Sequence, residues 1–304
     1  MPTTMSNRVT ALIQLSRWQE HVPFVIPLTL MGALLALKAL ANGQGVDLRL
    51  LAVMAANVLV VAYAFMINDI EDAPDDALDP DRAKRNPVTS GLISVRAGYT
   101  ACRVVAALTM LLYAFGGAWP FIIGGLTLLL SHLYSWKPIR LKAWPVTDIV
   151  SHSLMLSGLL MLAGYFTYHN APGLAWFVVA GVTLWSVYGQ LYNQLRDYEM
   201  DKAAGLKNTS IILGESNTRI AIWITIGLGI GSLLIAIVQN LFPVWLGAVA
   251  IVAILASMLV RPKGDMRGST VDVAGAAMQI RGLIVFNAIM LAWLVVAVIT
   301  QITG

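Results

Sequence analysis

Cysteine and charge are scarce in this chain. Cys102 is the single cysteine and lies in an apolar stretch, so the sequence has no disulfide pair and no thiolate metal site, and we expect Cys102 to be a small core residue. Charged residues make up 12% of the 304 positions, about half of their share in an ordinary soluble domain. The composition therefore excludes a typical soluble globular protein.

Long apolar segments take the place of charge. Apolar residues make up 58% of the chain, and the mean hydropathy is +0.74. Several segments are long enough to cross about 30 Å of hydrocarbon as helices. We therefore predict an all-α, multi-pass transmembrane bundle of about nine helices, over residues 21–41, 49–67, 98–116, 118–135, 147–167, 174–194, 218–239, 243–260 and 282–302.

The basic residues are distributed unequally between the loops. All 20 Lys and Arg residues except Lys38 and Arg49 fall in the amino-terminal segment or close to the loops after the second, fourth, sixth and eighth predicted helices. By the positive-inside rule those loops are cytoplasmic, and nine helices would leave the carboxyl terminus outside. The net charge of +4 therefore reflects membrane orientation, and we expect no nucleic-acid partner.

Two polar triplets with four-residue spacing stand at the predicted cytoplasmic ends of the second and sixth helices. Four-residue steps return to nearly the same helix face, so each triplet is predicted to align one amide and two carboxylates along one stripe. Oxygen ligands of this kind suit Mg²⁺, and two facing stripes predict a cage for divalent cations and the phosphates they neutralise. Pro74 is expected to kink the helix within the first triplet. The triplets are Asn68-x3-Asp72-x3-Asp76 and Asn193-x3-Asp197-x3-Asp201.

The chain also lacks a Pro-rich, Ser-rich or low-complexity linker, so we predict one domain over residues 1–304. Each triplet ends an even-numbered helix and precedes a charged loop. For this reason we predict that the domain contains two loosely similar halves, about 12–135 and 146–304.

Basic residues in two of these loops can bind phosphate. Arg140 can bind it through two parallel hydrogen bonds, whereas Lys142 and Lys207 act as point charges. The alternative is that these residues only fix the orientation of the loops. Asp148 and His152 stand one turn apart at the start of the fifth helix, where the carboxylate can orient the imidazole or simply stabilise the helix start.

Four motifs along the chain form a recognisable set. They are Asn68-Asp69-x2-Asp72-x3-Asp76, Asn86-Pro87-x3-Gly91, Tyr134-x3-Pro138-x-Arg140-x-Lys142, and Asp197-x3-Asp201 followed by Lys207-x-Thr209. With these motifs the chain resembles the UbiA superfamily of intramembrane prenyltransferases over nearly its whole length. The resemblance implies a single UbiA-like domain in a prokaryotic cell membrane, with two Asp-rich motifs at cytoplasmic helix ends and an active site that faces the cytoplasm.

The resemblance also implies a reaction. A polyprenyl group would move from a prenyl diphosphate donor to a lipophilic acceptor among the membrane lipids, with an aromatic quinone precursor expected first and a carotenoid or lipid second. The expected metal is Mg²⁺, with two ions held by Asn68, Asp72, Asp76, Asp197 and Asp201, of which the four aspartates are the expected catalytic residues. The expected substrate-binding residues are Asn68, Tyr134, Arg140, Lys142, Asn193 and Lys207. The alternative function is a cation-coupled transporter that uses the two acidic motifs.

Overall fold

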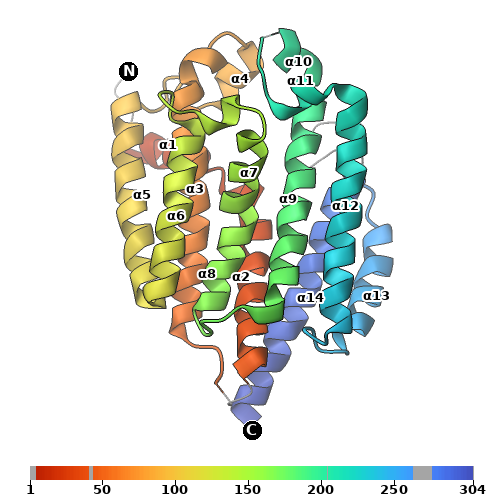
Figure 1. Ribbon diagram of the computed structural model, residues 1–304. Coiled ribbons are helices and arrows are strands. Elements are labelled where there is room, and N and C mark those ends of the chain that lie inside the picture. Colours follow the sequence, from red (N-terminus) through yellow and green to blue (C-terminus); the bar gives the residue numbers. More distant parts are fainter. Residues whose placement is uncertain (1–4, 41–43, 204, 263–275, 304) are drawn as a thin grey trace.

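A bundle of helices that run roughly side by side forms the protein (Figure 1). The computed structural model describes residues 5–40, 44–203, 205–262 and 276–303, and the regular elements in these ranges are helical. The α-helices are α1 (Met5–Ser16), α2 (Trp18–Leu40), α3 (Leu48–Asp76), α4 (Pro80–Arg85), α5 (Val95–Gly116), α6 (Ala118–Ser135), α7 (Thr147–Ser153), α8 (Leu159–Phe166), α9 (Trp176–Arg196), α10 (Tyr198–Ala203), α11 (Thr209–Leu213), α12 (Glu215–Val238), α13 (Leu246–Met258) and α14 (Ala276–Thr303).

Eight helical spans of the described residues are long and apolar enough to cross a membrane. They are built from α2, α3, α5, α6, α7 with α8, α9, α12 and α14. The ninth predicted span, over 243–260, is shorter than expected because α13 has 13 residues, about 20 Å at 1.5 Å per residue. The all-helical multi-pass fold is thus confirmed, and the ninth helix is an apolar helix of reduced length.

A buried polar hub lies in the centre of the bundle. Asn57 on α3 is fully buried, and its amide donates to Thr29 Oγ1 at 2.7 Å and to the carbonyl oxygen of Leu160 at 2.9 Å. The hydroxyl of Tyr113 donates to Asn57 Oδ1 at 2.5 Å. These bonds join α2, α3, α5 and α8, and they satisfy an amide that would otherwise be costly to bury among apolar side chains.

Two glycines let α2 and α8 touch through their backbones. A Cβ at Gly32 would lie 2.0 Å from the carbonyl oxygen of Met161, and a Cβ at Gly164 would lie 2.3 Å from that of Thr29. Small residues at helix crossings permit this close approach in membrane proteins. The contact holds α8 against the core.

The helical path from Thr147 to Phe166 changes its winding part of the way along. α7 continues through a π-helical turn, Leu154–Gly158, into α8. The amide of Leu159 donates to the carbonyl oxygen of Leu154, five residues back, which is the π-helical pattern. Turns of this kind are frequent near functional sites.

One end of the bundle gathers the segments that follow both acidic motifs. α4, α10 and α11 lie at this end, and the carboxyl-terminal part of α14 reaches the opposite end (Figure 1). α3, which carries the first motif, packs against α5 and α6, and α9, which carries the start of the second, packs against α12. The end with α4, α10 and α11 therefore brings the ends of both acidic motifs to one side of the bundle.

Candidate active site

The first motif, from Asn68 to Asp76, occupies the last turns of α3. The helix continues through Pro74 and ends at Asp76, and the amide of Ala77 donates to the carbonyl oxygen of Ala73 at 3.2 Å. Pro74, which was expected to kink the helix, thus does not interrupt it. Proline removes a single hydrogen bond only two residues before the helix ends, and the packing of α5 and α6 along α3 holds the helix on that path.

Two basic side chains from the loop between α6 and α7 close over this motif. Lys142 Nζ lies 2.5 Å from Asp72 Oδ2 and 2.8 Å from Asn68 Oδ1. Arg140 Nη2 lies 3.1 Å from Asp72 Oδ1 and 2.8 Å from Asp75 Oδ2. Burial lowers the pKa of Lys142, and the charge of Asp72 opposes that effect. Arg140 and Lys142, which the sequence analysis proposed as phosphate-binding residues, therefore lie against the first motif.

Asp76 points to a different partner from Asp72. Each four-residue step advances about 40° around a helix, so Asp76 lies about 80° from Asn68 on the surface of α3. Asp76 Oδ2 accepts a hydrogen bond at 2.8 Å from Asn86 Nδ2, which also donates to the carbonyl oxygen of Asp69 at 2.7 Å. The expectation of one straight stripe is thus too simple, because the drift over two steps separates the third residue from the first.

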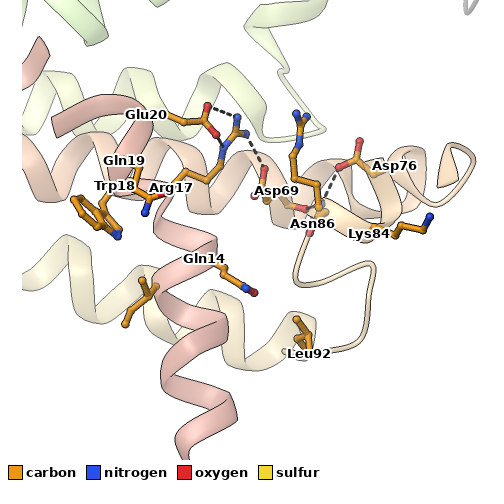
Figure 2. Close-up of a pocket in the computed structure, with 12 residues that line it drawn as sticks. Gln14, Arg17, Trp18, Gln19, Glu20, Asp69, Asp76, Lys84, Asn86 and Leu92 are labelled. Atoms are coloured by element: carbon orange, nitrogen blue, oxygen red, sulfur yellow. Dashed lines mark hydrogen bonds and ion pairs between the residues drawn. The ribbon is translucent and has the colours of Figure 1, made fainter. Parts of the chain in front are cut away.

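Asp76 contributes to a polar cavity of about 420 Å³ beside the junction of α1 and α2. Figure 2 shows Arg17 in this cavity with Glu20 on one side and Asp69 on the other. Arg17 donates to both carboxylate oxygens of Glu20, at 2.8 and 2.6 Å, and lies 3.4 Å from Asp69 Oδ1. Lys84 and Arg85 of α4 also line the cavity. The cavity therefore combines three basic and three acidic side chains.

The second motif lies across a break between two helices. α9 ends at Arg196, Asp197 is its C-cap, and Asp201 belongs to the short helix α10. The backbone still links the triplet, because the amide of Asp197 donates to Asn193 at 3.1 Å and the amide of Asp201 donates to Asp197 at 2.9 Å. Arg196 Nε donates to Asp197 Oδ1 at 3.0 Å. The second stripe is therefore not one continuous helix face as predicted.

Asp201 is partly removed from water. Burial, reinforced by the charge of Asp197, raises the pKa of Asp201 to about 6. Asn208 Nδ2 donates to Asp201 Oδ2 at 2.8 Å, and Asn208 Oδ1 accepts from the amide of Ile211 at the start of α11. Two neighbouring carboxylates with so little solvation are an environment that favours a bound cation.

The remaining predicted residues are placed around this centre. Asn193 lines the large apolar cavity described below. The hydroxyl of Tyr134 accepts from Gln190 Nε2 at 3.2 Å, which ties α6 to α9. Lys207 is exposed in the turn before α11. The structure thus brings Asn68, Asp72, Arg140 and Lys142 into direct contact, whereas Lys207 lies on the surface.

Among the described residues, no group of three or more Asp, Glu, His or Cys side chains is close enough to hold a metal ion. The acidic side chains are instead engaged by basic or amide groups. Asp72 is paired with Lys142 and Arg140, and Asp76 with Asn86. The chemistry of the donor set still suits a hard cation, since both motifs offer carboxylate and amide oxygens without thiolate or imidazole.

A large apolar cavity of about 1190 Å³ begins beside the second motif. Glu20, Asn193 and Arg196 line it at the motif end, and Phe242 and Pro243, between α12 and α13, line it at the other. Its walls come from α2, α9, α12, α13 and α14, together with the π-helical turn. A cavity of this length and polarity fits an extended hydrocarbon chain with a polar group at one end.

Two residues of the site were not among the sequence predictions. Asn86 follows the first motif and binds Asp76, and Asn208 follows the second and binds Asp201. Each Asn also accepts a backbone hydrogen bond with its side-chain oxygen, from Val88 in the first case and Ile211 in the second. An Asn at the start of a turn or short helix after each acidic motif is the signal that could have identified them.

The comparison with known sequences agrees with this architecture. Residues 25–271 match the UbiA prenyltransferase family. A lycopene elongase/hydratase from Haloferax volcanii is 31% identical over 233 residues, covering 70% of this chain and 68% of that protein. A 4-hydroxybenzoate octaprenyltransferase from Pseudomonas fluorescens is 28% identical over 231 residues, covering 75% of each chain.

The fold is also similar to solved structures. A UbiA homologue from Archaeoglobus fulgidus bound to GPP and Mg²⁺ has a TM-score of 0.69 at 22% identity, with 94% of this chain and 99% of that chain covered. The chain belongs to the UbiA prenyltransferase family. It is a multi-pass membrane enzyme of the prenyltransferase class, and this confirms the family that the motifs predicted.

Proposed function

We propose that this enzyme transfers a prenyl group from a prenyl diphosphate to a lipophilic acceptor, with the diphosphate held between the two acidic motifs. The observation that carries the proposal is the contact of Arg140 and Lys142 with Asp72. It is joined by an apolar cavity that Asn193 of the second motif lines. The basic groups would bind diphosphate oxygens, and the cavity would hold the prenyl chain. Such an arrangement separates the charged and apolar parts of one amphipathic substrate.

Mg²⁺ fits the residues present. We propose that Asn68, Asp72 and Asp76 hold one ion and that Asp197 and Asp201 hold a second, since both sets offer oxygen ligands and the burial of Asp201 beside Asp197 disfavours two unneutralised carboxylates. The ions would supply positive charge that stabilises the departing diphosphate. The relative from Archaeoglobus fulgidus that was solved with Mg²⁺ supports this assignment.

The protein's own groups would perform three further tasks. Arg140 and Lys142 would bind the developing negative charge of the leaving group, as preorganised charges do best in a site with little water. A carboxylate of the first motif would accept the proton that the acceptor loses. Lys207 would add a screened positive charge at the surface. We further propose that this end of the bundle faces the cytoplasm of a prokaryotic cell, as the distribution of basic residues predicts.

The polar cavity favours an uncharged acceptor. Arg17, which lines the polar cavity, is already bound through two hydrogen bonds by Glu20, a residue that lines both cavities, and is approached by Asp69. An acidic aromatic acceptor that bound Arg17 would have to displace Glu20, which costs a charge-assisted pair. We therefore rank a carotenoid or similar hydrocarbon acceptor ahead of an aromatic quinone precursor, which reverses the order expected from the sequence. The similarity to a lycopene elongase/hydratase supports this order.

The test is a transfer assay. Purified protein is incubated with Mg²⁺, labelled prenyl diphosphates of several lengths and a lipid extract of the host, and labelled products are identified by mass spectrometry. We expect one lipophilic product that requires both Mg²⁺ and Asp72. Cation flux through liposomes without prenyl diphosphate, together with no labelled product, would instead support a transporter.

A further inference from the structure

Asp148, at the start of α7, is fully buried and uses both carboxylate oxygens. Its Oδ2 accepts from Gln194 Nε2 at 2.7 Å and from the amide of Thr209 at 2.8 Å. Its Oδ1 accepts from Thr209 Oγ1 at 2.5 Å and from the amide of Ile149 at 2.8 Å. One carboxylate therefore joins the start of α7, the end of α9 and the start of α11.

The partners of Asp148 lead directly to the second acidic motif. Gln194 is the neighbour of Asn193 in α9, and its Oε1 accepts from the amide of Ser210 at 3.0 Å. Thr209 follows Asn208, whose amide binds Asp201. The position of Asp201 relative to α9 thus depends on contacts that meet at Asp148.

The same network also holds the basic loop between α6 and α7. The amide of Val146 donates to Thr209 Oγ1 at 2.8 Å, so this hydroxyl connects Val146 with Asp148. Val146 has φ 70° and ψ −49°, a backbone conformation that a β-branched residue rarely adopts. Arg140, six residues earlier in the same loop, also has a positive φ of 48°. An unfavourable backbone of this kind persists only where surrounding contacts determine it.

We propose that Asp148 is a positioning residue that sets the spacing between the second motif and the basic loop with Arg140 and Lys142. We call the network of Asp148, Gln194 and Thr209, with the amides of Val146 and Ser210, the Asp148 clamp. The inference rests on the proposed function, because it supposes that a diphosphate binds between these two elements. Asp148 itself touches no substrate in this scheme. Its buried, fully hydrogen-bonded carboxylate orients the groups that do.

The main test is Asp148→Asn, which keeps the shape of the side chain but turns one acceptor into a donor facing other donors. We expect the dissociation constant of inorganic diphosphate in the presence of Mg²⁺, measured by calorimetry, to rise about 10- to 100-fold. The Mg²⁺ concentration for half-maximal activity should rise with it, while the KM of the acceptor stays unchanged. The double variant Asp148→Asn with Gln194→Glu exchanges acid and amide, and it should restore much of the binding.

The matched control is Asn57→Ala, in the buried polar hub at the centre of the bundle. It should lower the midpoint of thermal unfolding without changing diphosphate binding by the folded protein. If Asp148→Asn behaves in the same way, the clamp has only a structural role and the inference is wrong. Wild-type protein that neither binds diphosphate nor transfers a prenyl group would instead overturn the proposed function.

A second pair of variants decides the case if Asp148→Asn does not fold. Thr209→Val removes the hydroxyl that connects Val146 with Asp148, whereas Thr209→Ser keeps it. We expect weaker diphosphate binding for Thr209→Val and nearly normal binding for Thr209→Ser. Equal binding by the two variants would contradict the clamp.

Discussion

The two acidic motifs share a spacing but differ in how their carboxylates are held. The first lies on one uninterrupted helix, and Asp72 is paired with Arg140 and Lys142 from another segment of the chain. The second crosses the break between α9 and α10, and Asp197 is paired with its own neighbour Arg196. The central carboxylate of the first motif is therefore bound directly by the basic loop, whereas the central carboxylate of the second is bound by its neighbour in the chain.

The motifs also have a contact in common. The last acid of each accepts a hydrogen bond from an Asn that lies further along the chain, Asp76 from Asn86 and Asp201 from Asn208. Each Asn uses its oxygen to fix the turn that follows. The comparison shows that both motifs keep the hydrogen bond from an Asn to the last acid, whereas the partners of the central carboxylate differ.

The largest effect is expected from the central carboxylates. Asp72→Ala and Asp197→Ala should each reduce product formation at least about 1000-fold, since each removes a carboxylate proposed to hold a Mg²⁺ ion whose positive charge stabilises the leaving group. Asp72→Ala should also lower the thermal midpoint more, because it leaves Lys142 and Arg140 without this partner. Labelled product and thermal unfolding in detergent measure the two effects. Asp81→Asn and Glu199→Gln, which change exposed acids near each motif, are the controls and should be nearly neutral.

The basic residues test whether the coupling of the first motif matters for catalysis. Lys142→Met should reduce transfer about 100-fold, because it removes a buried charge beside Asp72. Lys207→Met should cost less than about 10-fold, because solvent screens an exposed charge. Steady-state kinetics with varied prenyl diphosphate distinguish the two. Equal losses would show that the contact between Lys142 and Asp72 has no special importance.

The shared Asn contacts should give intermediate effects. Asn86→Ala and Asn208→Ala are each expected to reduce activity about 10- to 100-fold, as removal of a group that orients a ligand does. Asn86→Ala should also destabilise the fold more, because Asn86 is buried and binds the carbonyl oxygen of Asp69. Asn217→Ala, at an exposed site on α12, provides the control for an amide outside the site. Normal activity in both variants would mean that the shared contact serves folding alone.

The smallest effect concerns the acceptor. Glu20→Gln should weaken the pair with Arg17 and increase the use of an aromatic acid acceptor a few-fold relative to a hydrocarbon acceptor. Competition between the two acceptors in one assay measures the ratio of products. An unchanged ratio would show that Arg17 does not take part in acceptor selection.

Much of this site could be predicted from the sequence because its residues follow helical spacing. The start of α3 and the helical placement of Asn68 and Asp72 at its end follow from periodicity, apolar length and family motifs, although the predicted span 49–67 stops nine residues short of Asp76. The direction of Asp76 did not follow, because a drift of about 40° per step sends it toward Asn86. The break at Asp197 was also missed, since nothing in the spacing distinguishes one helix from two that share backbone hydrogen bonds.

The partners of Asp148 could not be predicted from the sequence. The pattern left two alternatives, orientation of His152 or stabilisation of the helix start. Its observed partners, Gln194 and Thr209, are 46 and 61 residues away. Contacts over that separation depend on how α7, α9 and α11 pack, and local propensity carries no information about them. The reduced length of α13 has a similar origin, because an apolar run does not reveal where a helix begins within it.

The π-helical turn Leu154–Gly158 determines how the Asp148 clamp is rotated about the helix axis relative to the polar hub around Asn57. On one side of it, Asp148 faces α9 and α11; on the other, the carbonyl oxygen of Leu160 receives the amide of Asn57. One extra residue in a helical turn rotates everything beyond it by about 100°. Deleting a single residue here would therefore leave an ordinary α-helix of nearly the same length. In that helix, Asp148 and the carbonyl oxygen of Leu160 could no longer both reach their partners. The number of residues in the turn is therefore constrained in addition to its side chains, of which Met155 and Ser157 are buried.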